Sequence, residues 1–231
     1  MPLAAAPRLL VFSKTTGFRH SSIPEGIAAL ARLAAKEGWE ATFTENAAVF
    51  TPEKLATFDA VCFLNTTGDP LDAAQMEALK AFLAAGRGFA GIHAAADTET
   101  DDPWYPTMLG ARFLSHPKQQ TATLQVHHNC ADAHLVSHLG PTWQRFDEWY
   151  DFREPVPADA CLLLTVDETS YTGGKMGKLH PLAWTRRVGG ARVFYTALGH
   201  TEESYHEPLF LEHIRRGLSW ALEGRKPDAA P

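Results

Sequence analysis

The sequence has little of what marks a nucleic-acid-binding, membrane or disulfide-rich protein. Its 231 residues carry a formal net charge of -6, so no excess of positive charge is available to hold a phosphate backbone. No apolar run approaches the roughly 20 residues that a membrane-spanning helix needs. The three cysteines, Cys62, Cys130 and Cys161, are too few and too scattered for a disulfide framework or a zinc knuckle. We therefore expect no nucleic acid and no membrane among the partners.

The start and the composition of the chain exclude further classes. Residues 1–13 contain only the short apolar run Leu9–Phe12, which is too short for the apolar core of a signal peptide. With 45% hydrophobic and 21% charged residues, the composition is that of an ordinary globular protein. We expect a soluble, cytoplasmic protein in which residues 1–231 form one domain, with a core at about 8–222 and a frayed tail at 223–231. A homo-oligomer is compatible with this expectation.

The first half of the chain alternates between short apolar segments and amphipathic helical segments. Strands are predicted at 8–13, 40–45, 59–64 and 88–93, and helices at 22–38 and 72–86. Strands that alternate with helices at such short intervals favour a parallel sheet with helices on both faces.

The second half is less regular. It predicts strands at 121–127, 144–150, 161–166, 182–187 and 192–196, and a final helix at 207–222. Glycine-containing residues 188–191 indicate an antiparallel hairpin between the last two strands. We therefore expect an α/β fold with a mainly parallel central sheet and antiparallel additions.

Polar side chains that could take part in chemistry collect where the predicted strands end. Because ligands of open α/β sheets bind outside the carboxyl ends of the strands, this convergence is the strongest indication of function in the sequence. The side chains at these positions are Lys14, Phe18, Arg19, His20, His93, Asp97, Glu148, Tyr150 and His200.

His93 stands out because only small or aliphatic residues surround it in the segment 91–95, GIHAA. The segment is similar to a nucleophile elbow, in which small neighbours permit a strained backbone and leave the central side chain exposed. A histidine there could act as an acid, a base or a metal ligand; the alternative is a polar residue that only ends a strand. His20 precedes a predicted helix start, which suits a neutral base, or else is a surface histidine. Arg19 beside it is either a substrate clamp or a solvated charge.

A carboxylate and two aromatic residues lie together in residues 147–150, DEWY. On a strand, Glu148 and Tyr150 would share one face. Such a pair suits a sugar, because the carboxylate accepts hydrogen bonds from hydroxyls while the ring covers C–H groups; the alternative is a surface carboxylate beside core aromatics. Trp104 and His116 either cover the same edge of the sheet or pack elsewhere, and His180 stands at the entry to the strand at 182–187.

The sequence does not identify a cofactor. His93, Asp97, Glu148, His180 and His200 are all of metal-ligand type, and imidazole with carboxylate suits zinc, manganese or iron, but their spacing gives no compact ligand signature. We expect no nicotinamide and no nucleotide. The loop at 14–22 lacks GxGxxG, and the glycine-rich turn at 172–178 lacks the Walker spacing and lies between two strands.

Several segments, in chain order, resemble the ThuA-like (trehalose-utilisation) family. They are VFSKTTGFRHSSIPEGIAAL, FLNTTGDPL, GFAGIHAAADTE, DEWYDF, HPLAW and YTALGHTEESY, and the resemblance runs from about Leu10 to about Leu218. It implies a flavodoxin-like, three-layer core related to class I glutamine amidotransferases. It also implies work tied to sugar metabolism, since members are associated with disaccharides and their 3-keto derivatives.

The amidotransferases need a cysteine thiolate at the turn after the strand, because an acyl-enzyme forms there. Here His93 holds the matching position, and no cysteine lies in a comparable G-x-C-x-G turn. We therefore expect not a glutaminase but an enzyme that hydrolyses, eliminates or epimerises a sugar by acid–base chemistry. Its expected catalytic residues are His20, His93, Glu148 and His200. Its expected substrate-binding residues are Lys14, Phe18, Arg19, Asp97, Trp104, His116, Tyr150 and His180. The alternative is a non-catalytic sugar-binding or regulatory domain with the same fold.

Overall fold

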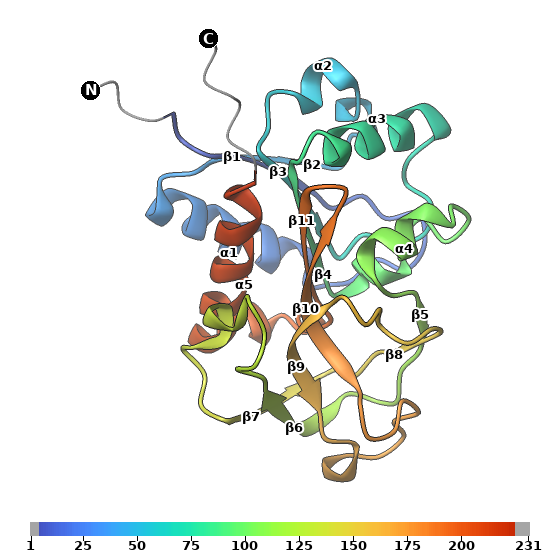
Figure 1. Ribbon diagram of the computed structural model, residues 1–231, viewed down its shortest axis with the longest axis vertical. Coiled ribbons are helices and arrows are strands. Elements are labelled where there is room, and N and C mark those ends of the chain that lie inside the picture. The colour runs from blue at the N-terminus through green and yellow to red at the C-terminus, as the bar shows by residue number, and fades with distance from the viewer. Residues whose placement is uncertain (1–4, 225–231) are drawn as a thin grey trace.

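A nine-stranded mixed sheet runs through the centre of the protein (Figure 1). The computed structural model describes residues 5–224, so most of the tail predicted at 223–231 lies outside the described residues. The strand order is β2-β1-β3-β4-β11-β10-β9-β6-β7. The strands are β1 (Arg8–Phe12), β2 (Glu40–Thr44), β3 (Ala60–Leu64), β4 (Gly88–Ile92), β6 (Gln120–Val126), β7 (Thr142–Asp147), β9 (Cys161–Val166), β10 (Pro181–Val188) and β11 (Ala191–Thr196).

The sheet divides into a parallel and an antiparallel part. From β2 through β1, β3 and β4 to β11, every pair of neighbours is parallel. From β11 through β10, β9 and β6 to β7, every pair is antiparallel. The predicted fold class is confirmed.

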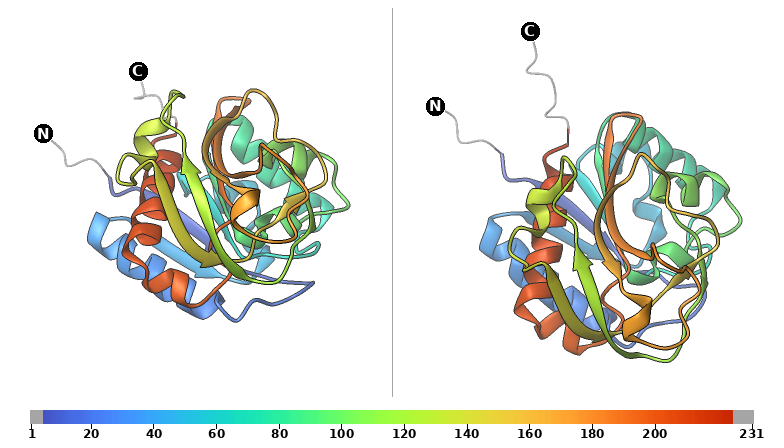
Figure 2. Two further views of the ribbon diagram at one scale, coloured as in Figure 1. Left: turned by 90° about the horizontal axis from the view of Figure 1, so that it is seen from below. Right: turned by 60° about the horizontal axis from the view of Figure 1, so that its bottom comes forward.

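Helices cover both faces of the sheet, which makes three layers (Figures 1 and 2). Helices α1 (Ile23–Glu37) and α5 (Pro208–Leu222) lie side by side on one face, and α3 (Ala73–Ala84) and α4 (Trp104–Leu109) lie on the other. The short helix α2 (Pro52–Leu55) packs beside α3. None of the helices in residues 5–224 is long and apolar enough to cross a membrane.

The helix boundaries follow local sequence signals. Asp72 and Gln75 form a reciprocal capping box at the start of α3. Gly38 ends α1 with a φ of 74°, a left-handed conformation that favours glycine. At the start of α1, however, Ser22 makes no side-chain cap, and its Oγ instead accepts a hydrogen bond from Asn65 Nδ2 at 3.0 Å. This bond ties the start of α1 to the loop after β3.

The chain order places a crevice at one edge of the sheet. After β1 the chain runs through α1 outward to β2, and after β3 it runs through α3 in the opposite direction to β4, so the two helical connections lie on opposite faces of the sheet. Isolated bridges from Thr15 to Thr67 and from Gly68 to Thr98 hold the loops after β1, β3 and β4 together. This is the edge at which the sequence collects its polar residues.

Some elements differ from the sequence prediction. The strand expected at 144–150 ends at Asp147, so Glu148 and Tyr150 lie beyond the sheet and do not share a strand face. The small antiparallel pair of β5 (Phe113–Ser115) and β8 (Asp151–Phe152) has too few residues for a periodic signal. The structure also pairs Cys130 and Cys161 in a single disulfide that the sequence analysis does not predict.

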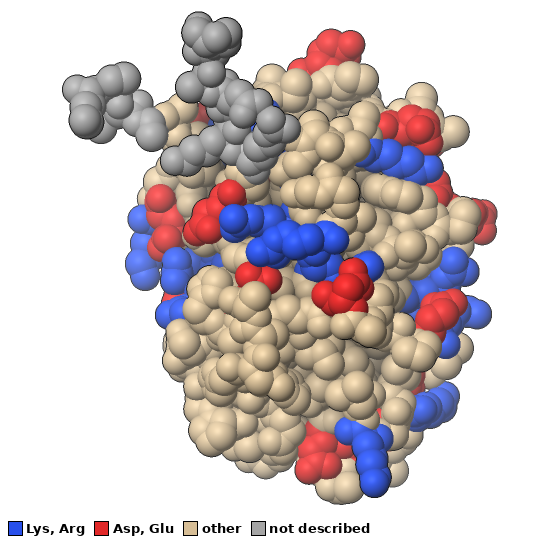
Figure 3. All heavy atoms as spheres, viewed as in Figure 1, with Lys and Arg blue, Asp and Glu red and all other residues tan. Residues whose placement is uncertain are grey.

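The surface view shows acidic and basic residues interspersed on the face turned to the reader (Figure 3). Basic side chains are paired with acids in several places, for example Arg192 with Glu223 and Arg187 with Asp132. Such a mixed pattern gives no extended field of one sign on this face.

Leu79→Ala tests the core that supports the site edge. Leu79 is 0% exposed in α3, so the shortened side chain should leave a cavity and lower the free energy of unfolding by ~2–5 kcal/mol, measured by urea denaturation. Leu209→Ala is the control, because Leu209 is 43% exposed and should cost less than ~1 kcal/mol. Equal losses in both variants would contradict the packing described.

Candidate active site

Four side chains from four separate loops meet at the carboxyl edge of the sheet. His20 lies between β1 and α1, His93 directly follows β4, Glu148 directly follows β7, and His200 lies in the loop after β11. One potential ligand atom from each of the four lies within 4.8 Å of every other. These are the four residues that the sequence predicts to be catalytic, and we call them the His/Glu cluster.

The backbone of His93 fixes its ring. The residue has a φ of 49°, an unusual value for a residue with a side chain, and it is 0% exposed, so the expectation of an exposed elbow residue is wrong. Its Nδ1 lies 2.7 Å from the carbonyl oxygen of Ala197, which can only accept, so Nδ1 carries the proton. In the neutral ring, Nε2 therefore presents a lone pair to the cluster, 3.1 Å from His200 Nδ1 and 3.5 Å from Glu148 Oε2.

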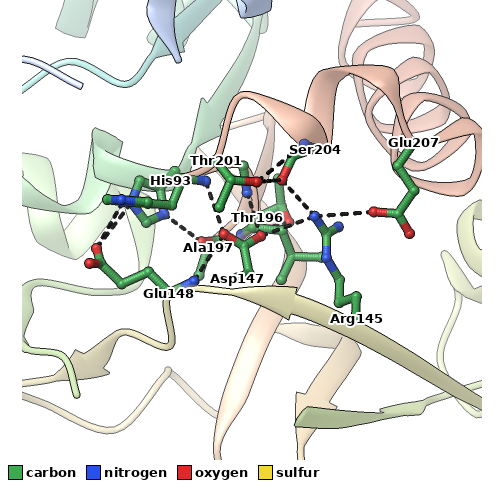
Figure 4. Close-up of polar contacts among 12 residues, drawn as sticks. His93, Arg145, Asp147, Glu148, Thr196, Ala197, Thr201, Ser204 and Glu207 are labelled. Carbon is green, nitrogen blue, oxygen red and sulfur yellow. Dashed lines mark hydrogen bonds and ion pairs between the residues drawn. The ribbon is translucent and has the colours of Figure 1, made fainter. Parts of the chain in front are cut away.

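Asp147 holds two segments of the cluster in place (Figure 4). Its Oδ1 accepts hydrogen bonds from the backbone N–H groups of Glu148 at 3.0 Å and His200 at 3.1 Å, and its Oδ2 accepts one from Gly199 at 2.9 Å. The side chain of Glu148 can then reach His200, with Oε2 3.0 Å from Nδ1. A single buried carboxylate thus sets the relative position of two cluster residues.

Arg145 supplies the countercharge to Asp147. Its Nη2 lies 3.1 Å from Asp147 Oδ2 and 3.3 Å from a Glu207 carboxylate oxygen, and its guanidinium lies 4.8 Å from the ring centres of both Trp143 and Phe210. The side chain is only 2% exposed, so this ion pair is screened little by solvent.

Burial and mutual contact set the charges of the cluster. Burial, together with the neighbouring rings of His93 and His200, lowers the pKa of His20 to about 3, so this ring is neutral near pH 7. Burial by itself raises the pKa of Glu148, but the contacts of its carboxylate with His200 and His93 outweigh burial and lower the pKa well below its usual range. The cluster therefore combines a carboxylate with neutral imidazole nitrogen.

A cavity of about 410 Å³, which we call the inner cavity, opens beside the cluster. Four of the predicted substrate-binding residues line it: Phe18, Asp97, His116 and Tyr150. Tyr150 packs its ring 4.3 Å from the ring of His93, and His116 Nδ1 lies 3.1 Å from Glu148 Oε1. Burial raises the pKa of the Asp97 carboxyl above its usual range.

The other predicted substrate-binding residues lie away from this cavity. Lys14 Nζ donates to the carbonyl of Pro70, and Arg19 pairs with Glu45 at 2.7 Å on the surface. Trp104 packs in α4 against the Nζ of Lys80.

His180 is fully buried behind the cavity. Its Nε2 donates to the carbonyl oxygen of Tyr150 at 2.8 Å, and its Nδ1 lies 2.8 Å from Glu168 Oε1. Asp151 completes a second group of metal-ligand types, but backbone and side-chain donors already occupy these carboxylates: Lys175 N and Ser115 Oγ bond Asp151, and Met176 N bonds Glu168. His180 therefore positions Tyr150 rather than touching a ligand in the cavity.

Three residues of the site are not among those expected from the sequence. Gln119 and Phe113 line the cavity, and Gln119 Nε2 lies 2.6 Å from His200 Nε2. Both come from an irregular stretch that has no periodic pattern. Asp147 lies next to Glu148 inside the strand predicted at 144–150, and no sequence signal marked it as the last residue of that strand.

Backbone strain gathers at the same edge of the sheet. Among described residues other than glycine, positive φ values occur at Asn65 (49°), His93 (49°) and Glu99 (50°), which follow β3, β4 and the short helix after β4. Glu99 is buried, and its Oε1 accepts a hydrogen bond from Leu71 N at 2.8 Å. Burial raises the pKa of Glu99 to about 7.

The fold and the site together define a flavodoxin-like α/β protein with a histidine- and carboxylate-lined pocket at the carboxyl edge of its sheet. Residues 8–221 match the family model ThuA, whose description is trehalose utilisation. The chain belongs to this family, which links it to carbohydrate metabolism. Comparison with curated proteins gives no match.

Solved structures share the fold. A ThuA-like protein from Bacteroides uniformis superposes with a TM-score of 0.77 at 20% identity, over 94% of this chain and 93% of its own. One from Parabacteroides merdae gives 0.78 at 18% identity, over 98% of this chain and 94% of its own. A cytoplasmic protein from Salmonella typhimurium gives 0.65 at 11% identity, over 94% and 99%. At such identities the likeness supports the fold alone.

Asp147→Asn should destabilise the protein strongly. The amide nitrogen cannot accept a backbone N–H, and Arg145 loses its closest countercharge, so we expect the free energy of unfolding to fall by ~3–5 kcal/mol in a denaturant titration. Asp101→Asn, on an exposed loop residue, is the control and should change little. A loss below ~1 kcal/mol for Asp147→Asn would show that this carboxylate does not hold the site together.

Glu99→Gln should change how stability depends on pH. The folded pKa of about 7 lies above the unfolded value, so the contribution of Glu99 is complete at low pH and is lost as the pH rises through about 7. Glutamine keeps the acceptor for Leu71 N but never ionises. Between pH 5 and pH 8, the free energy of unfolding of the variant should therefore rise by ~2–3 kcal/mol relative to that of the wild type, measured by urea denaturation. The exposed substitution Glu40→Gln is the control, and a pH-independent difference for Glu99→Gln would refute the prediction.

Proposed function

We propose that the His/Glu cluster binds a divalent cation and that the protein is an enzyme acting on a sugar. The observation that carries this proposal is the meeting of three imidazoles and one carboxylate, from four loops, with ligand atoms within 4.8 Å of one another. Nitrogen and carboxylate donors in this number suit zinc, manganese or iron.

The surroundings of the cluster support a cation. The hydrogen bond from His93 Nδ1 to the carbonyl of Ala197 is the kind of outer contact that orients metal-binding histidines and leaves Nε2 free. His20 is neutral, and its buried Nδ1 has no hydrogen-bond partner among residues 5–224, so this nitrogen is free to bind a cation. Glu148 stays ionised because of its histidine neighbours.

A bound cation would supply a Lewis acid that polarises a carbonyl or hydroxyl oxygen of the substrate. The protein supplies the remaining functions through residues around the inner cavity. Asp97, with its raised pKa, would exchange a proton with the carbon or oxygen next to that group. Phe18, which is 68% exposed at the cavity, would cover a C–H face of the sugar. These parts suit hydrolysis, elimination or epimerisation of a disaccharide or its 3-keto derivative.

Glu148→Gln tests the cation and the chemistry together. The amide has nearly the same shape but no charge, so we expect binding of Mn²⁺ or Zn²⁺, followed by calorimetry, to weaken at least ~100-fold. Turnover of disaccharides and their 3-keto forms, followed by mass spectrometry and proton-exchange NMR, should fall at least ~100-fold as well. Removal of the cation with a chelator should abolish turnover in the wild type, and re-addition should restore it.

Glu168→Gln is the matched control, because it makes the same chemical change in the second histidine–carboxylate group, where Met176 N and His180 Nδ1 already contact Glu168 Oε1. It should leave metal affinity within about threefold. Full turnover in metal-free protein would refute the proposal that a divalent cation takes part in the reaction. Sugar binding without turnover or hydrogen exchange would instead identify a non-catalytic sugar-binding domain.

A further inference from the structure

A second and larger cavity, of about 730 Å³, lies directly beside the inner cavity. We call it the outer cavity. Two residues, Gln119 and His200, line both cavities, and a 2.6 Å hydrogen bond joins their side chains. This bonded pair forms the boundary that the two cavities share. A ligand that contacts His200 in the inner cavity therefore lies next to the outer cavity.

The outer cavity offers an aromatic surface and many hydrogen-bonding groups. Phe146, on the edge strand β7, lines it and is 51% exposed. Side chains of Gln144, Ser21 and Thr201 supply neutral donors and acceptors around it. Arg145, also in the lining, is nine-tenths or more buried, and its Nε and Nη1 have no hydrogen-bond partner within the described part of the chain.

The inner cavity has the same combination of an exposed ring and polar groups. The exposed large apolar side chains of the described residues include two aromatic ones, Phe18 and Phe146, and each lines one of the two cavities. An exposed aromatic ring that lines a cavity suits the C–H face of a sugar ring. Two such rings, on either side of the Gln119–His200 pair, match a ligand that has two rings.

The charges indicate which kind of ring the outer cavity accepts. Glu202, Glu203 and Glu207 all line it, while the charge of Arg145 is already paired with Asp147. Three carboxylates against one paired cation disfavour a phosphate or carboxylate on the ligand and favour hydroxyl groups, which can donate to them.

We infer that the outer cavity is a second subsite, which binds the non-reacting ring of a neutral, two-ring polyhydroxylated substrate while the other ring lies in the inner cavity. This inference rests on the proposed function, because it assumes that the reaction takes place at the His/Glu cluster. In this inference, Phe146 selects for substrate length, and Glu202, Glu203 and Glu207 select for a neutral ligand. None of these four residues lines the inner cavity.

The test compares sugars with one and two rings on protein supplied with Mn²⁺ or Zn²⁺. The probes are a panel of glucose disaccharides, including trehalose, and methyl α-glucoside as the one-ring counterpart, with affinities measured by calorimetry. In the wild type, at least one disaccharide should bind about tenfold more tightly than the methyl glucoside. Phe146→Ala should remove this advantage and leave methyl glucoside binding unchanged, whereas Phe18→Ala should weaken both. Leu209→Ala, an exposed apolar residue that lines neither cavity, should change neither affinity.

The outcomes separate this inference from the proposed function. If no disaccharide binds more tightly than the methyl glucoside, or if Phe146→Ala weakens the binding of both sugars equally, the second subsite is refuted. The proposed function is then still tested separately by turnover and metal binding. If trehalose 6-phosphate binds more tightly than trehalose, the preference for a neutral ring is refuted. If the wild type binds neither Mn²⁺ nor Zn²⁺ and turns over no sugar of the panel, both the proposed function and this inference are refuted.

Discussion

The geometry of the site depends on one buried carboxylate, that of Asp147. Its two oxygens accept three backbone N–H groups, from Glu148, Gly199 and His200, and pair with the guanidinium of Arg145. Charge-assisted hydrogen bonds of this kind are roughly twice as strong as neutral ones, and a buried charge is tolerated only when it is paired. The loop after β7 and the loop after β11, which are far apart in sequence, are therefore fixed relative to each other through a single side chain.

Burial and the carboxylate of Glu148 explain why the cluster can hold several imidazoles at close distance. Bringing His20, His93 and His200 together costs free energy if more than one is charged, and burial adds to that cost. The pKa of His20 is lowered to about 3, so this ring remains neutral, and Glu148 lies close to both His93 and His200 to offset a charge on either. Because the backbone of His200 is held by Asp147 rather than by its own ring, both of its ring nitrogens remain available to Glu148, Gln119 or a ligand.

The sequence predicted the fold and the members of the cluster because both follow from local patterns. Apolar strands that alternate with capped helices predict a parallel sheet, and polar residues at the strand ends then converge on one edge. It could not predict that His93 is buried, because that depends on the carbonyl of Ala197, a contact across more than a hundred residues. Nor could it place Glu148 correctly on a strand face, because the strand ends one residue earlier. Arg19 and Lys14 also lie near a strand end, and Trp104 begins α4, but the side chains of all three find partners away from the inner cavity. Sequence position alone does not reveal side-chain direction.

The two cavities of the site are lined by different combinations of strands and loops. His20, His93 and His200 come from loops after the parallel strands β1, β4 and β11, whereas Glu148, Gln119 and Phe146 come from the antiparallel part of the sheet and its loops. Rigid elements keep reacting groups within the small tolerances that catalysis needs, while an edge strand such as β7 tolerates substitution on its exposed face. Changes at Phe146 or Gln144 can therefore alter which ligand fits the outer cavity without disturbing Asp147, whose side chain points to the opposite, buried face of the same strand. Under the proposed function, recognition of the second ring can therefore vary at the exposed face of β7 while the His/Glu cluster stays unchanged.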